Sequence, residues 1–190
     1  LHISFINFKL RHICVFSILI LMKVNNNLIL IGMMASGKST VGRLLAKKLN
    51  LRFYDTDFII ERKTKMKISE IFEKRGENEF RNLEKKIALR LLDKNNYVIS
   101  LGGGAFLNHS IKKKAQKNGD TICLNWNTKT IISRIRKNNK RPIALNLTNN
   151  EIKDLIIKRS KIYAEAKYKI NCENMTKLEI INTIIKMLKL

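Results

Sequence analysis

The sequence predicts an α/β fold, a P-loop three-layer α/β/α arrangement with a five-stranded parallel sheet and a short mobile lid. Two features predict it: short apolar runs alternate with segments of helical periodicity, and the first run leads into a glycine-rich loop. Alternating strands and helices favour a parallel sheet with helices on both faces. Ligands of such folds bind beyond the carboxyl ends of the strands, so the loops after the strands form the candidate site.

Five short apolar runs are the expected strands, because strands of a parallel sheet are buried on both faces. They span residues 28–31, 51–54, 97–101, 121–124 and 168–170. Apolar residues spaced three and four apart predict the helices. These span residues 41–49, 59–73, 77–92, 106–117, 128–137, 151–165 and 177–188. The polar interval 137–150, which holds the one proline of the chain, is expected to form the lid.

The length of 190 residues suits one domain, which we expect to span residues 23–190. Residues 1–22 contain an apolar run behind Lys9 and Arg11 that is shorter than the ~20 residues needed to cross a membrane. We interpret this segment as a non-native or dispensable N-terminal extension, with Met22 as the expected start of the protein. A membrane anchor is the less favoured interpretation.

The formal net charge of +23 raises the question of a nucleic-acid or membrane partner. The lysines, however, are scattered among Asn and Ile through every segment, and few aromatic residues stand beside them to stack on bases. We interpret the charge as compositional drift and expect neither nucleic acid nor membrane as a partner. The positive field would still attract ATP and an acidic substrate.

The three cysteines, Cys14, Cys123 and Cys172, are widely separated and show no metal-ligand spacing. An odd number of dispersed cysteines indicates a reducing compartment, so we expect a cytoplasmic protein. Nothing apolar is left over for an interface, and we expect a monomer.

The glycine-rich loop is the strongest motif, since residues 32–39 match G-x-x-x-x-G-K-[ST] between a strand and a helix. Its glycines let the backbone approach phosphates, which the N–H groups and the helix N-terminus then bind. Lys38 is expected to reach the β- and γ-phosphates of ATP, and Ser39 to bind Mg²⁺. A chance match arises in about one in a hundred chains of this length, so a simple tight turn is a poor alternative.

Two polar segments admit both a functional and a structural interpretation. Asp55 and Asp57 follow the second strand and could hold a metal and a substrate hydroxyl, or they could simply cap a helix. Arg81 could bind a carboxylate in bidentate fashion. Alternatively, it could pair with Glu84, three residues on, on a solvated helix face.

Three glycines, Gly102–Gly104, directly follow the third strand and would let a ligand approach the backbone. Residues 98–101 contain no acid, so the metal carboxylate usual in that strand is missing and Asp55 is the natural substitute. Arg141 in the lid and Arg159 in the next helix could stabilise a transferring phosphate. In a chain this basic, any single arginine is more often just solvated.

In their order and spacing these segments resemble the shikimate kinase family over residues 24–190. The matching segments are GMMASGKST at 32–40, YDTD at 54–57, EIFEKRGENEFRNLE at 70–84, ISLGGGA at 99–105, KRPIA at 140–144 and RSKIY at 159–163. The resemblance implies a fold like that of nucleoside monophosphate kinases. It also implies transfer of the ATP γ-phosphate to the 3-hydroxyl of shikimate, on the way to chorismate and the aromatic amino acids.

The resemblance also implies the roles of individual residues, with ATP and Mg²⁺ as cofactors. The catalytic residues would be Lys38, Asp57 and Arg141. The ATP-binding residues would be Gly32, Ala35, Ser36, Gly37, Lys38, Ser39, Thr40, Arg134 and Arg141. The substrate-binding residues would be Asp57, Arg81, Gly102, Gly103, Gly104, Arg159, Phe72 and Phe80. The metal ligands would be Ser39 and Asp55.

The chain departs from the family pattern at two positions. The family usually has glycine where Ala35 stands, and proline where Lys161 stands, two residues after Arg159. Within the same fold the alternatives are a related small-molecule kinase such as gluconate kinase, or a non-catalytic nucleotide- or RNA-binding relative. The paired arginines and the three glycines weigh against the first, and the intact Lys38 and Asp57 against the second. The short lid weighs against a nucleotide acceptor.

Overall fold

A computed structural model describes residues 26–137 and 147–190, and within them five parallel strands form one sheet in the order β2-β3-β1-β4-β5. This confirms the predicted fold class. The strands are β1 Asn27–Ile31, β2 Arg52–Asp55, β3 Tyr97–Ser100, β4 Gly119–Asn125 and β5 Tyr168–Asn171. The expected extension 1–22 and the lid residue Arg141 lie outside the described residues.

Strand β1 is the central strand of the sheet, and all five of its residues are buried. It pairs with β3, where Leu30 lies opposite Ser100, and with β4, where Ile31 lies opposite Cys123. Its side chains alternate between the two faces of the sheet. Ile29 and Ile31 join one core cluster, and Leu28 and Leu30 join the other.

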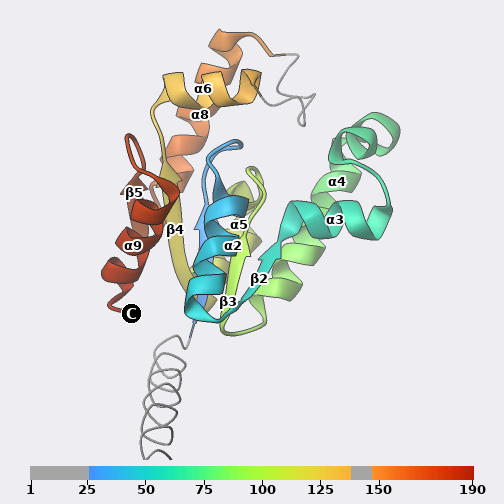
Figure 1. Ribbon diagram of the computed structural model, residues 1–190. Coiled ribbons are helices and arrows are strands. Elements are labelled where there is room, and N and C mark those ends of the chain that lie inside the picture. The colour runs from blue at the N-terminus through green and yellow to red at the C-terminus, as the bar shows by residue number, and fades with distance from the viewer. Residues whose placement is uncertain (1–25, 138–146) are drawn as a thin grey trace, which may run out of the picture.

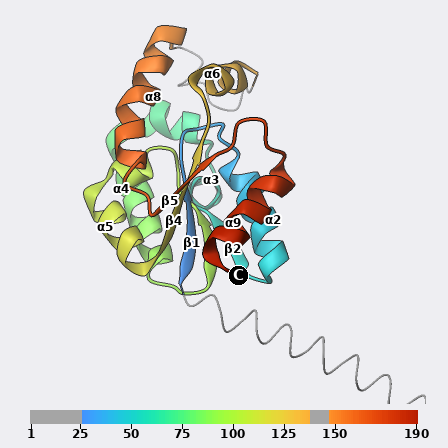
Figure 2. The ribbon, with the colours of Figure 1, turned by 90° about the vertical axis from the view of Figure 1, so that its left-hand side faces the viewer.

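Helices cover both faces of the sheet (Figures 1 and 2). Helices α2 Lys38–Leu49 and α9 Lys177–Leu188 pack over Leu28 and Leu30. The Ile29 face is covered by α4 Ile68–Leu92, α5 His109–Asn118, α6 Thr128–Arg136 and α8 Asn149–Tyr163. A third, smaller cluster joins α4 to α3 Thr56–Thr64. Burying each of these Leu and Ile side chains contributes roughly 1.5–3 kcal/mol.

Helix boundaries differ from the prediction in one place and agree with it in another. The expected helix 59–73 is broken, because Lys65 adopts a left-handed conformation and α4 begins only at Ile68. The expected break between residues 73 and 77 is present as a kink at Gly76, whose φ of 80° and ψ of 169° are not helical, so α4 consists of two helices joined there. The apolar periodicity runs on across Lys65 without Gly or Pro, so the sequence carries no signal for the first break.

The segment predicted as helix 106–117 contains two elements. A single 3₁₀ turn, η1 Ala105–Leu107, precedes α5. The Asn108 side chain then caps α5 by accepting hydrogen bonds from the Ser110 and Ile111 N–H groups. Helix α8 begins similarly at Thr148, which forms a capping box with Glu151. Among the helices of residues 26–137 and 147–190, none has both the length and the apolar character to cross a membrane.

Candidate active site

The candidate site lies at the carboxyl ends of β2, β3 and β1, three neighbours in the sheet. Asp55 lies opposite Ser100, which in turn lies opposite Leu30, so the loops after the three strands leave the sheet at the same edge. In Figure 1 the loops after β1 and β3 lie between the α6–α8 pair and the α3–α4 pair. The motifs predicted from the sequence are therefore brought together.

The loop from Gly32 to Lys38 has the backbone geometry of a phosphate cradle. Gly32 and Gly37 have φ angles of 137° and 88°, a region in which glycine avoids the steric cost of a Cβ. A Cβ on Gly32 would also come within 2.9 Å of the Leu124 carbonyl oxygen. Ala35 has a φ of 60° in the same loop. Helix α2 begins directly after it, so its free N–H groups face the loop.

Lys38 is folded into this loop and is buried. Its Nζ donates hydrogen bonds of 2.9 Å to the carbonyl oxygens of both Gly32 and Met33, and it lies 3.4 Å from the Ser36 hydroxyl. The ammonium group is thereby held at the cradle, and the next two residues, Ser39 and Thr40, are exposed in the first turn of α2.

Asp55 caps a helix, as the structural interpretation expected, and also contacts the mouth of the cradle. One carboxylate oxygen caps α3 by accepting a hydrogen bond from the Phe58 N–H at 3.2 Å. The other accepts a hydrogen bond from the Ser39 hydroxyl at 2.5 Å. A hydroxyl and a carboxylate oxygen therefore meet at the mouth of the cradle.

These two oxygens suit Mg²⁺. Mg²⁺ takes oxygen ligands and is usually held by one or two protein groups together with substrate phosphates and water. In the part of the chain that the structure describes, no cluster of three or more His, Cys, Asp or Glu residues could hold a metal by itself. The Ser39–Asp55 pair thus fits a metal that arrives with a nucleotide.

The segment Gly102–Gly104 passes close to groups from three elements. A Cβ on Gly102 would lie 2.5 Å from an Asp57 oxygen and 2.6 Å from a Glu84 oxygen. A Cβ on Gly104 would overlap the Arg81 guanidinium. Thr56 ties this segment to the start of α3 by accepting a hydrogen bond from the Gly102 N–H at 2.8 Å. The three glycines thus leave room for charged side chains.

Arg81 forms the pair with Glu84 that the structural interpretation expected, but its partner is buried rather than solvated. The Arg81 Nη1 donates to Glu84 at 2.7 Å, and Glu84 is only 3% exposed. Glu77 accepts two further hydrogen bonds from Arg81. The guanidinium lies over Phe80 and Phe72, with its carbon 5.1 and 6.0 Å from the ring centroids. The ion pair therefore fixes Arg81 at the edge of the site.

Glu84 is a functional candidate that the sequence analysis missed. Burial raises the pKa of its carboxyl group, with a further contribution from Asp57, although Arg81 and Arg159 oppose the shift. Burial lowers the pKa of Arg81, but Glu84 and Glu77 outweigh it and raise the net value. The signal was present in the sequence, because Glu84 shares a helical face with Phe80, Ile87 and Ala88.

Arg159 reaches the same glycine segment from α8. Its Nη1 donates a hydrogen bond to the Gly103 carbonyl at 3.2 Å, and the Tyr163 hydroxyl donates to the same oxygen. Burial raises the pKa of Tyr163 to about 12, so this hydroxyl stays a donor at neutral pH. Among the residues that the structure describes, none accepts a hydrogen bond from the buried Arg159 Nε. An unsatisfied buried donor costs about 1–3 kcal/mol, so an acceptor beside this nitrogen would be stabilised.

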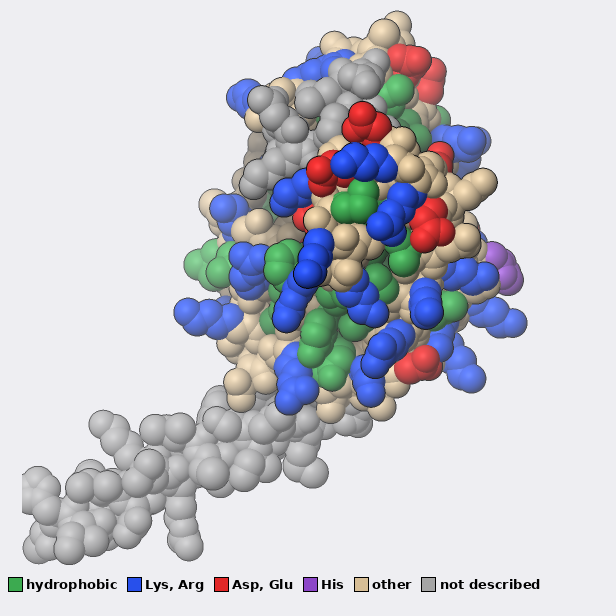
Figure 3. All heavy atoms as spheres, turned by 90° about the vertical axis from the view of Figure 1, so that its right-hand side faces the viewer, with side chains coloured by type: hydrophobic (Ala, Val, Ile, Leu, Met, Phe, Trp, Pro, Cys, Tyr) green, Lys and Arg blue, Asp and Glu red, His purple; other side chains and the backbone are tan. Residues whose placement is uncertain are grey.

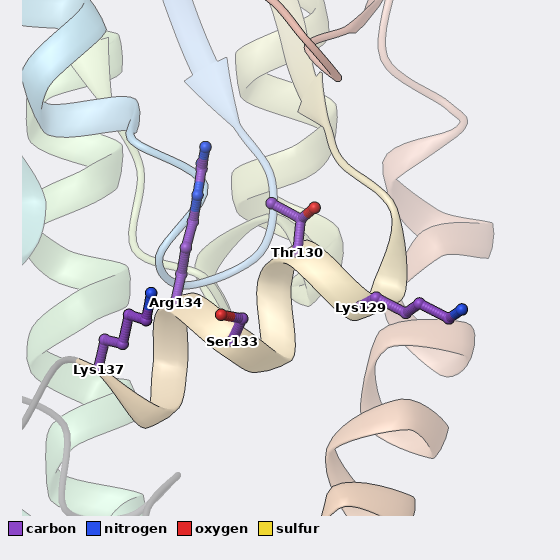
Figure 4. A pocket seen from close by; sticks show the side chains of 5 residues that line it. All are labelled: Lys129, Thr130, Ser133, Arg134 and Lys137. Atoms are coloured by element: carbon purple, nitrogen blue, oxygen red, sulfur yellow. The ribbon is translucent and has the colours of Figure 1, made fainter.

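Arg134 lies apart from these groups, on α6. Its guanidinium carbon is 3.6 Å from the centroid of the Trp126 ring. With three other residues of α6 and the following Lys137 it lines a hollow of about 420 Å³, and Figure 4 shows its side chain directed toward the loop after β1. Of the predicted site residues, only Arg141 lies outside the described parts of the chain.

Comparison with known proteins gives one family. The family model described as shikimate kinase matches residues 34–189. A shikimate kinase of Persephonella marina is 42% identical over 159 residues, which cover 84% of this chain and 96% of the relative. The structure of a shikimate kinase from Acinetobacter baumannii in complex with shikimate has a TM-score of 0.83 and 30% identity, covering 88% of this chain and 94% of the other. A gluconokinase from Sinorhizobium meliloti, with a TM-score of 0.54 and 14% identity over 88% and 93% of the two chains, shares the fold alone.

Proposed function

The chain belongs to the shikimate kinase family, and from this premise we propose that it transfers the γ-phosphate of ATP to the 3-hydroxyl of shikimate. The products are ADP and 3-phosphoshikimate, an intermediate on the way to chorismate and the aromatic amino acids. One observation carries the proposal: two guanidinium groups, those of Arg81 and Arg159, converge on the segment Gly102–Gly104 beside Asp57.

The loop Gly32–Lys38 and the start of α2 bind the nucleotide in this reaction. The backbone N–H groups of the loop bind the phosphates, and Lys38 exchanges its two carbonyl partners for phosphate oxygens. Ser39 and Asp55 would hold Mg²⁺. The metal neutralises charge on the β- and γ-phosphates when it is bound.

The charged groups around the three glycines bind the phosphate acceptor. Arg81, fixed by Glu84, and Arg159, with its free Nε donor, bind the substrate carboxylate. Asp57 then lies beside Gly102, where it orients the hydroxyl acceptor and takes its proton during transfer. Such positioning supplies most of the catalysis in phosphoryl transfer.

The test is ADP release by the purified full chain with Mg-ATP, with and without shikimate, and with gluconate as the control acceptor. We expect release that depends on shikimate and is absent with gluconate. Asp57→Ala should reduce kcat by at least about a hundredfold, because the general base contributes 10²–10⁴. Nucleotide binding without shikimate-dependent release would overturn the proposal in favour of a different acceptor or a non-catalytic relative.

A further inference from the structure

Trp126, the one tryptophan of the chain, joins the phosphate cradle to the end of β4. Its indole N–H donates a hydrogen bond of 2.9 Å to the carbonyl oxygen of Ser36, ninety residues earlier in the chain. Ser36 is buried inside the cradle, between Ala35 and Gly37. The indole therefore holds the backbone of the loop at its centre.

The ring face of Trp126 holds a second group. The Arg134 guanidinium lies on this face at 3.6 Å from the centroid, well within the range of a cation–π contact. Arg134 also lines the hollow on α6 together with Thr130 and Ser133 (Figure 4). A guanidinium is planar and has two faces, so with one face on the indole a second flat ring can stack only on the other.

The start of α6 has anchors of its own besides Trp126, which packs against both core clusters. The Asn127 side chain caps the helix by accepting from the Thr130 N–H, and Glu173 accepts hydrogen bonds from the Asn127 N–H and the Thr130 hydroxyl. Trp126 fixes the conformation of the Arg134 side chain, whose four rotatable bonds would otherwise be free to rotate. Fixing a side chain before its ligand arrives improves binding by removing an ordering cost.

We propose that Trp126 is a positioning residue for the nucleotide, an inference that rests on the proposed function. Its N–H fixes the cradle that receives the phosphates, and its ring fixes Arg134, already one of the expected ATP-binding residues, so that the second guanidinium face receives the adenine ring. One side chain thereby positions groups at both the phosphate end and the adenine end of the ATP site.

The test is a double-mutant cycle on ADP binding, measured by calorimetry without shikimate. In the wild-type background, Arg134→Ala and Arg134→Lys should each raise the Kd for ADP about tenfold, since Lys lacks the planar face. In Trp126→Leu the same changes should raise Kd less than about twofold, because the arginine is no longer held. In Trp126→Phe, which keeps a ring but lacks the N–H, the Arg134 effect should persist.

Tripolyphosphate, which has no base, separates stacking from charge. Its Kd should change less than about twofold in Arg134→Lys and should rise in Trp126→Phe, where Ser36 loses its donor. Lys113→Ala on α5 removes an exposed charge far from the hollow and is the matched control, with unchanged binding of both ligands. In steady-state assays the Trp126 variants should raise the KM for ATP and leave that for shikimate unchanged.

Intrinsic fluorescence gives a measurement that needs no Trp126 variant. Because the chain has one tryptophan, its emission reports this site, and ADP should change it in the wild type but much less in Arg134→Lys. An equal Arg134 effect in the wild-type and Trp126→Leu backgrounds would overturn the proposal, as would emission unchanged by saturating ADP. Failure of shikimate-dependent turnover would instead refute the proposed function and leave this binding cycle interpretable.

Discussion

Ala35 places a side chain in the left-handed region, at φ 60°, at the position where the expected family pattern has glycine. This conformation costs an L-residue about 1–2 kcal/mol. Replacing Ala by Gly relieves that cost. It also raises the conformational entropy of the unfolded chain, which lowers the free energy of unfolding by about 0.4–1 kcal/mol. We therefore expect Ala35→Gly to stabilise the protein by up to about 1 kcal/mol, measured by urea denaturation.

The matched control is Ala46→Gly, the same replacement inside α2. There the conformation is helical, and we expect a loss of about 1 kcal/mol. If Ala35→Gly lost as much stability as Ala46→Gly, the left-handed conformation of Ala35 would be wrong.

Glu84 should give the stability of the protein a pH dependence. Burial raises the pKa of Glu84 in the folded state above its ordinary value of 4.5. Its protonation therefore favours folding: the contribution is fully present below the ordinary pKa and is lost as pH rises through the raised one. Relative to Glu84→Gln, the wild type should lose free energy of unfolding across this window. The measurement is urea denaturation between about pH 4 and about pH 7.5.

A difference that stays constant with pH would contradict the burial of the Glu84 carboxylate. Glu73→Gln, at an exposed position of the same helix, is the control and should show no such trend. The same Glu84→Gln variant should raise the KM for shikimate if Arg81 binds the shikimate carboxylate. In this variant Arg81 loses the buried carboxylate of Glu84 that holds it in place.

At the scale of the elements, α8 continues unbroken through Lys161, the position at which the expected family pattern has proline. A proline inside a helix costs about 3 kcal/mol, partly because it leaves the carbonyl four residues earlier without its donor. Here the Ser160 hydroxyl already donates to that carbonyl, on Ile157, at 2.7 Å. We expect Lys161→Pro to cost only about 1–2 kcal/mol in thermal or urea denaturation.

The Ser160→Ala background tests this explanation. Without the hydroxyl, Lys161→Pro should cost at least about 1 kcal/mol more than it does in the wild type. Lys161→Ala, which keeps the backbone N–H, is the control and should be nearly neutral. An equal cost of the proline in both backgrounds would refute the role of Ser160.

The helices and strands were predictable where the apolar pattern was clear, as in the five strands. Helix α2 was predictable because its apolar spacing begins directly after the glycine-rich loop. The break at Lys65 was not, because it has neither Gly nor Pro and depends on how α3 packs on α4 around Ile60 and Ile71. Within the site, motif spacing placed Asp55, Arg81 and Gly102 at one edge. The helical spacing of Glu84 from Phe80, Ile87 and Ala88 was a signal for its burial that motif spacing did not use. No sequence signal indicated that Trp126 contacts Ser36, because that contact depends on packing across the fold.

At the scale of the whole molecule, the dominant feature is the net charge of +23. Figure 3 shows lysines and arginines spread over one face rather than gathered at one place. Several lysines on other elements pair with acids, as Lys112 does with Glu165 and Lys114 with Asp93. A diffuse positive field attracts anions over long distances, and salt screens it within about 8 Å at physiological ionic strength.

Both proposed substrates are anions, so this field should speed their capture without changing the chemistry. We expect kcat/KM for ATP and shikimate to fall at least about fivefold between about 20 and about 300 mM NaCl, while kcat changes less than about twofold. Replacing Lys112, Lys113 and Lys117 on α5 by Gln should flatten this dependence with little change in kcat, because these residues lie outside the site. Their replacement by Arg, which keeps the charge, is the matched control. A kcat/KM insensitive to salt would show that the charge has no part in substrate capture.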